Sequence, residues 1–197
     1  MIEAEFTLAQ GEFRLSASFH DGGIISLSGE NGAGKSTFLN ALAGFVPLQS
    51  GTIRVNGRDV TELEVQKRGI VHIAPGSFIG NLSVERHIAF PGKPDMDKER
   101  IRELKESFGI DFQGKVGNLS MGQRIRVSLA TAFYRRPEAV LIDEALSNLS
   151  DPATVMDEIR MLSGSLKADV ILVAHSLPDI KSEHSYTIAN GIMHREF

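Results

Sequence analysis

The sequence contains no cysteine among its 197 residues, so disulfides, thiolate zinc sites and cysteine nucleophiles are excluded. It also lacks an excess of positive charge, because 21 basic residues stand against 25 acidic ones. We therefore expect no nucleic acid partner. Long apolar runs are missing too. The strongest are Ala139–Ile142 and Val170–Ala174, far short of the roughly 20 residues that cross a bilayer. Any role at a membrane must come through a partner.

The composition is that of an ordinary globular domain, with 42% hydrophobic and 23% charged residues. Strands are predicted at residues 2–8, 13–19, 24–28, 52–56, 69–74, 139–142 and 170–174, with a closing pair around Asn190-Gly191. Helices are predicted at residues 35–43, 82–90, 98–108, 121–136 and 152–166, with a short one from Pro178. Strands that alternate with helices pack as parallel βαβ units. We therefore predict an α/β fold with a mostly parallel sheet, an N-terminal antiparallel β region and a helical insert.

A glycine-rich segment links the strand at 24–28 to the helix at 35–43. Residues 29–37, GENGAGKST, fit the pattern G-x-x-x-x-G-K-[ST]. The glycines let successive backbone N–H groups converge on an anion, and the helix N-terminus adds partial positive charge. Lys35 can reach the terminal phosphates of a nucleotide, and the Ser36 hydroxyl can bind Mg²⁺. The segment predicts a P-loop NTPase core.

Two carboxylates follow the apolar strand Ala139–Ile142. In open α/β sheets ligands lie beyond the carboxyl ends of the strands, so Asp143 is expected near the phosphate loop as a Mg²⁺ ligand. Glu144 can orient and deprotonate an attacking water.

The segment Leu119-Ser120-Met121-Gly122-Gln123 resembles the L-S-G-G-Q signature of ATP-binding-cassette (ABC) ATPases, with Met121 in place of one glycine. The motif order is also similar to that family: phosphate loop, signature, apolar strand with Asp-Glu, then His175 after the next strand. The resemblance covers essentially the whole chain. Ser120 and Gln123 also form a capping box for the following helix, and the two interpretations are compatible because a capped helix start is an anion site.

The resemblance implies a single cassette over residues 1–197, with a nucleotide-binding core at 1–75 and 137–197 and the helical insert at 76–136. It implies ATP and Mg²⁺ as ligands, and a homodimer or paired cassette in which the signature of one subunit closes over the ATP of the other. The implied catalytic residues are Lys35, Glu144 and His175, and the metal ligands are Ser36 and Asp143. The implied ATP-binding residues are Gly29, Asn31, Gly32, Ala33, Gly34, Lys35, Ser36, Thr37, Ser120, Gly122 and Gln123.

The function implied is ATP hydrolysis that powers an integral membrane transporter, at the cytoplasmic face of the membrane. Residues 78–82 are the expected docking surface for the membrane partner. The alternatives are a non-transport ABC ATPase that acts on soluble complexes, and an ATP-binding module that has lost hydrolysis. The segment Lys67-Arg68-Gly69-Ile70, at the start of a predicted strand, resembles the same place in molybdate- or tungstate-type importers. This resemblance does not identify a substrate.

Three positions depart from the family pattern. No glutamine stands near Ala74-Pro75-Gly76, where the family places a Mg²⁺- and water-binding Gln. Ser150 stands where the family pattern has an Asp, and Asp151 follows one residue later. We expect Asp151 to be the N-cap of the helix that begins at Pro152. Phe13 is the only aromatic candidate to stack on adenine, although its alternation favours a core position.

Overall fold

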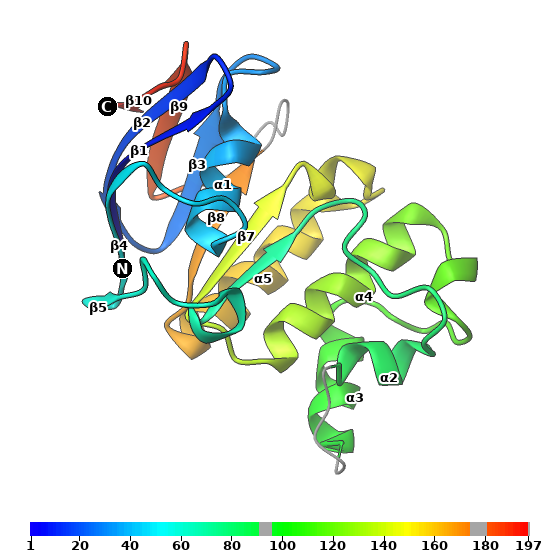
Figure 1. The fold of residues 1–197 in the computed structure, drawn as a ribbon. Coiled ribbons are helices and arrows are strands. Elements are labelled where there is room, and N and C mark those ends of the chain that lie inside the picture. Colours follow the sequence, from blue (N-terminus) through cyan, green and yellow to red (C-terminus); the bar gives the residue numbers. More distant parts are fainter. Residues whose placement is uncertain (91–95, 174–180, 197) are drawn as a thin grey trace.

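The computed structural model describes residues 1–90, 96–173 and 181–196, which form one mixed sheet with helices on both faces (Figure 1). The strands are β1 (Ile2–Gln10), β2 (Phe13–Asp21), β3 (Ile24–Ser28), β4 (Ser50–Val55), β5 (Arg58–Asp59), β6 (Ile70–Ile73), β7 (Ala139–Asp143), β8 (Asp169–Val173), β9 (His184–Ala189) and β10 (Ile192–Glu196). The helices are α1 (Lys35–Ala43), α2 (Val84–Ile88), α3 (Lys98–Ser107), α4 (Met121–Tyr134) and α5 (Pro152–Leu166).

The sheet has the strand order β5-β4-β1-β2-β10-β9-β3-β8-β7-β6. Strands β9, β3, β8, β7 and β6 run parallel to one another, whereas β9 pairs antiparallel with β10 and β1 pairs antiparallel with β2 and β4. The predicted α/β class, with its antiparallel N-terminal region, is confirmed. Two hairpins turn at Asn56-Gly57 and Asn190-Gly191, where both residues of each pair have positive φ. Asn-Gly is the sequence that favours such two-residue turns.

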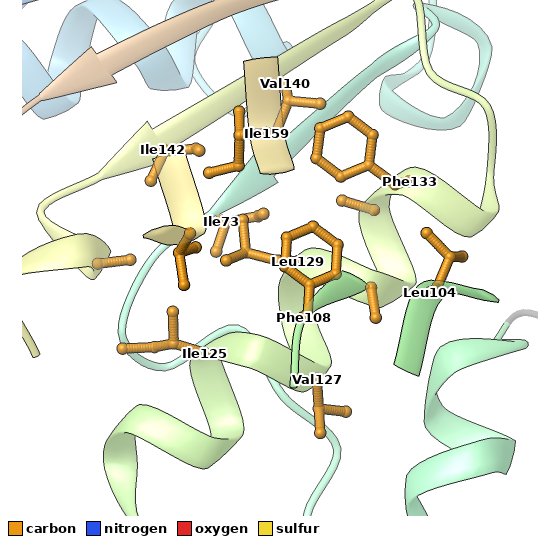
Figure 2. Close-up of a cluster of buried hydrophobic side chains, with 14 of the residues drawn as sticks. Ile73, Leu104, Phe108, Ile125, Val127, Leu129, Phe133, Val140, Ile142 and Ile159 are labelled. Carbon is orange, nitrogen blue, oxygen red and sulfur yellow. The ribbon is translucent and has the colours of Figure 1, made fainter. Parts of the chain in front are cut away.

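Alternate residues of the central strands pack into two hydrophobic clusters, one on each face of the sheet. In β7, Ala139 and Leu141 face the cluster that includes α1 and strands β1, β2 and β4. Val140 and Ile142 face the other cluster, which includes α2, α3, α4 and α5. Figure 2 shows Phe108 and Phe133 among these side chains, together with Ile73 and Ile159. The helices at 84–134 therefore share one continuous core with a face of the sheet.

The helix expected at 82–90 is shorter in the structure, where α2 spans only Val84–Ile88. The carbonyl of Leu82 accepts a hydrogen bond from the amide of Val116, and Ser83 forms an isolated β-bridge with Lys115. Ser83 then caps the helix by accepting from the amide of Arg86. Pairing with a distant segment thus takes Leu82 out of the helix. The helix expected from Pro178 falls outside the described residues. Within the part of the chain that is described, no helix is long and apolar enough to span a membrane.

The end of α1 is held by Arg68, a side chain that is only 5% exposed. Its Nη1 donates to the carbonyls of Ala41 and Leu42 at 3.1 Å each, Nε donates to Leu63, and Nη2 donates to Thr61. Burial lowers the pKa of this guanidinium. The last carbonyls of a helix have no intrahelical partner, so one cation satisfies the end of α1 and fixes the loop before β6 to it.

We predict that Arg68→Met lowers the free energy of unfolding by about 2–4 kcal/mol, because it removes hydrogen bonds to four carbonyls, those of Ala41 and Leu42 in buried positions. Urea unfolding followed by circular dichroism measures the loss. The neighbouring Lys67→Met is the matched control, since its ion pair with Glu64 is exposed and contributes about 0.5 kcal/mol. Equal effects of the two substitutions would contradict the assignment.

Candidate active site

Two glycines fix the shape of the phosphate loop. Any other residue at these positions would be strained, both by the positive φ and by a close contact of its Cβ. Gly29 has φ 137, and a Cβ there would lie 2.3 Å from the Ile188 carbonyl oxygen. Gly34 has φ 113, and a Cβ there would lie 2.7 Å from the Phe13 ring. Gly34 is also the N-cap of α1 and supplies no side-chain cap, so the first-turn N–H groups of the helix are left for a ligand.

Lys35 lies inside this loop and is 5% exposed. Its Nζ donates to the carbonyls of Gly29 at 2.7 Å and Glu30 at 3.0 Å. The ammonium is therefore held against the loop's own backbone. Because Lys35 is also the first residue of α1, a phosphate in this loop meets a positioned cation and a helix N-terminus together.

A pocket of about 260 Å³ opens in front of the loop. It is lined by Gln10, Phe13, Asn31, Gly32, Gly34, Lys35, Ser36, Thr37 and Glu144. Glu144 adopts φ 54 and follows β7 directly, and its amide donates to the Val173 carbonyl at 3.0 Å. The structure thus brings Glu144, Lys35 and Ser36 to one pocket from segments that are far apart in the sequence.

Asp143 is 9% exposed, and its Oδ1 is buried without a hydrogen-bond partner among the described residues. An unpartnered buried carboxylate oxygen is costly, and a cation or a cation-bound water would satisfy it. In the described ranges no group of three or more His, Asp or Glu could bind a metal alone. The donor set of Ser36 and Asp143 fits Mg²⁺, which keeps several waters and shares phosphate oxygens.

The signature segment lies at the start of α4, and none of its residues lines this pocket. Ser120 and Gln123 form the predicted capping box: the Ser120 amide donates to Gln123 Oε1, and Gln123 N donates to Ser120 Oγ. A Cβ added at Gly122 would lie 3.1 Å from the Asn148 carbonyl oxygen, so α4 begins close to the loop after β7. Met121 is 39% exposed. His175 lies outside the described residues.

Residues 13–147 match the family described as ABC transporter. The molybdate/tungstate import ATP-binding protein WtpC of Archaeoglobus fulgidus is 36% identical over 85% of this chain and 73% of its own length. The chain belongs to the ABC transporter family. The thiamine import ATP-binding protein ThiQ of Aliivibrio fischeri is 31% identical over 88% of the chain and 79% of that protein. The chain spans about half the length of several other relatives.

The fold is also that of solved ATP-binding cassettes. A dimeric cassette in a post-hydrolysis state, bound to ADP and Pi, superposes with a TM-score of 0.81 over 100% of this chain and 98% of that one. Its sequence identity is 20%, so this likeness concerns the fold alone.

Phe13 is one of the positions at which the chain departs from the family pattern. In the structure its side chain lies partly in the core and partly in a pocket. The side chain packs against the core cluster of α1 and is only partly buried. Its exposed part lines the pocket of the phosphate loop and a neighbouring groove of about 690 Å³ between that loop and the β9–β10 hairpin. The prediction of a core residue was therefore incomplete, because alternation along β2 cannot show that the phosphate loop turns back over the ring.

Asp151 is the second departure, and the capping interpretation of its side chain was wrong. Asp151 occupies the N-cap position of α5, but its side chain makes no cap hydrogen bond. The carboxylate instead forms an ion pair with Arg126 of α4, whose Nη1 also donates to the Phe108 carbonyl at 2.7 Å. The loop after β7 is thereby tied to the helix that carries the signature.

We predict that Asp151→Ser lowers the free energy of unfolding by about 1 kcal/mol, although serine is an excellent N-cap residue. The substitution places a residue that favours the N-cap position there and removes the carboxylate that pairs with Arg126. Urea unfolding of the wild type, Asp151→Ser, Arg126→Met and the double variant gives the coupling energy between the two side chains. A coupling energy of zero would refute the ion pair as the role of Asp151.

Proposed function

We propose that the chain binds and hydrolyses ATP as one half of a head-to-tail pair and so powers an import complex whose other part is an integral membrane protein. The observation that carries this proposal is the pocket in which Lys35, Ser36 and Glu144 meet, while the signature segment lies elsewhere on the same chain. A second cassette is required to bring a signature to this pocket. The relatives named for import support the transport role.

Each residue of the pocket has a role in this proposal. The amides of the phosphate loop and Lys35 bind the β- and γ-phosphates, and Ser36 with Asp143 would hold Mg²⁺. Bound Mg²⁺ supplies neutralisation of the charge that develops on the phosphoryl group. Glu144 orients and deprotonates the attacking water. His175 contacts the γ-phosphate in the same subunit, and Ser120, Gly122 and Gln123 approach it from the partner.

The division of labour along the chain follows from these positions. Residues 1–75 and 137–197 act as the nucleotide-binding core, and residues 76–136 transmit its closure to the membrane partner. We place the chain at the cytoplasmic face of a membrane, where ATP is supplied and the partner's loops are accessible. The relatives are named for molybdate or tungstate and for thiamine, so the likeness supports import and leaves the substrate open.

We predict Mg²⁺-dependent ATP hydrolysis that Glu144→Gln slows at least about 100-fold, because it removes the general base. Lys35→Ala abolishes hydrolysis through loss of phosphate binding, and EDTA abolishes it by removing the metal. Phosphate release is measured in steady state over a range of protein concentrations. Turnover per molecule rises with protein concentration until the pair is saturated, because each site needs two chains.

The same assay distinguishes the alternative functions. Wild-type turnover no faster than that of Lys35→Ala would show a binding module without hydrolysis. The missing glutamine and the displaced Asp151 are the features that favour that alternative. Turnover that is independent of protein concentration would contradict the composite site.

We further predict that Phe13 stacks on the adenine ring. Phe13→Ala should weaken ATP binding by about 1–3 kcal/mol, the range for loss of one aromatic–base stack, whereas Phe13→Tyr retains it. A fluorescent ATP analogue is titrated against these variants in the Glu144→Gln background. Inorganic tripolyphosphate, which has no base, serves as competitor and should bind all of them equally. An equal loss for ATP and tripolyphosphate would assign Phe13 to the shape of the phosphate loop instead.

A further inference from the structure

The loop between β6 and α2, residues 74–83, contains no glutamine. Its first residues are Ala74, Pro75 and Gly76. Ser77 closes the turn on itself, because its Oγ accepts from the Ala74 amide at 2.9 Å and its amide donates to the Ala74 carbonyl at 2.9 Å. The Ser77 hydroxyl is thus used within the turn, and contacts with other elements are made by the Ser77 carbonyl and by residues 78–82.

Three side chains of α4 contact either that loop or His87 of α2. Ser128 Oγ donates to the Ser77 carbonyl at 2.8 Å. The Arg124 guanidinium carbon lies 4.6 Å from the centre of the Phe78 ring. Thr131 Oγ1 lies 2.8 Å from His87 Nδ1. Positions 124, 128 and 131 are spaced i, i+4 and i+7, so they share one face of the helix.

His87 connects this face of α4 to the backbone of the loop. It is 4% exposed, and its Nε2 accepts from the amide of Ile79 at 3.1 Å. Nε2 therefore carries no proton, and Nδ1–H donates to Thr131 Oγ1, which in turn donates to the Val127 carbonyl at 2.7 Å. Burial lowers the pKa of His87, which keeps the ring in the neutral form that this chain of hydrogen bonds requires.

The backbone provides a fourth contact next to the signature. The amide of Gly117 donates to the Gly80 carbonyl at 2.9 Å, and a Cβ on Gly117 would lie 2.9 Å from that oxygen. Arg124 Nη2 donates to the Gly117 carbonyl at 2.6 Å. The loop is thus bound both to the face of α4 and to the segment that leads into Ser120.

We propose that His87, together with Arg124, Ser128 and Thr131, is a positioning device that makes the loop at residues 77–82 move as one body with the signature helix α4. In this chain the device takes the place of a side-chain link from the loop to the nucleotide. The inference rests on the proposed function, in which the pair closes on ATP and the loop meets the membrane partner. Closure would then reach the partner through the signature helix of each chain.

The absence of cysteine from the sequence allows this to be tested with pairs of spin labels at introduced cysteines. Asn81 reports on the loop, Arg135 on the end of α4 and Met161 on α5 of the core, and all three are exposed. Distances are measured for the three pairs in the Glu144→Gln background, with and without Mg-ATP, after dilution with unlabelled chain. We expect ATP to change the 81–161 and 135–161 distances by several ångströms and to leave the 81–135 distance unchanged.

Substitutions then test the named side chains. His87→Phe keeps a ring but removes both hydrogen bonds, and Ser128→Ala removes one hydroxyl. Each should broaden the 81–135 distribution and reduce the 81–161 shift, while the 135–161 shift remains. His87→Gln, which restores an acceptor for the Ile79 amide, should recover much of the wild-type behaviour. Ser163→Ala is the matched control, because Ser163 Oγ donates to a carbonyl at an equally buried position of α5, and it should change no distance.

Failure of the inference and failure of the proposed function give different results. A 135–161 shift without an 81–161 shift means that the loop stays with the core, which overturns the inference and leaves the ATPase intact. Unchanged 81–135 distributions in both His87→Phe and Ser128→Ala overturn it as well. If no pair shifts although a fluorescent ATP analogue binds, the closing pair itself is wrong, and the inference fails with it.

Discussion

The parallel pairing of β3, β8 and β7 is the constraint on which the rest of the site depends. Val173 pairs with Leu27 on one side and with Asp143 on the other, so the phosphate loop and the Asp143–Glu144 pair leave the sheet at the same level. Adjacent strands lie about 4.8 Å apart, which sets these groups two strands, or about 10 Å, from each other. A shift of β7 by one residue would turn Asp143 to the opposite face. Register therefore decides whether the pocket exists.

Close packing of the phosphate loop against its neighbours makes that pocket stiff. Gly29 lies against the Ile188 carbonyl of β9, and Gly34 lies against the ring of Phe13. The strand β9 is in turn held at Tyr186, which donates to the buried Asp21, and burial raises the pKa of the tyrosine to about 12. The loop thus takes its shape from β2 and β9 as well as from its own glycines. This explains why a turn of glycines and one lysine can be a precise anion site.

Local sequence patterns predicted the elements that are decided locally. The bounds of β3, α1 and α5 are those expected from apolar runs, Gly44 and Pro152. The acids after β7 were expected near the phosphate loop because strand ends converge in a parallel sheet, and Glu144 lines the same pocket as Lys35 and Ser36. Distant contacts account for the failures. Asp151 is a residue type that favours N-caps, but its side chain pairs with Arg126, which lies 25 residues away. Leu82 lies outside α2 because its carbonyl accepts from the amide of Val116. No periodicity encodes such pairings.

The shared core limits how the helical part can move against the sheet. Ile73 of β6, Leu129 of α4 and Ile159 of α5 belong to one cluster, so a rotation of the helices must slide apolar surfaces past each other without opening them. The chain passes between the sheet and the helical part at residues 76–136 at two places, after Ile73 and before Ala139. Each crossing contains a proline, Pro75 and Pro137, which fixes its own φ and lacks an N–H. If the loop travels with α4, the backbone rotation is confined to the few residues around these prolines, as expected for hinges between packed bodies.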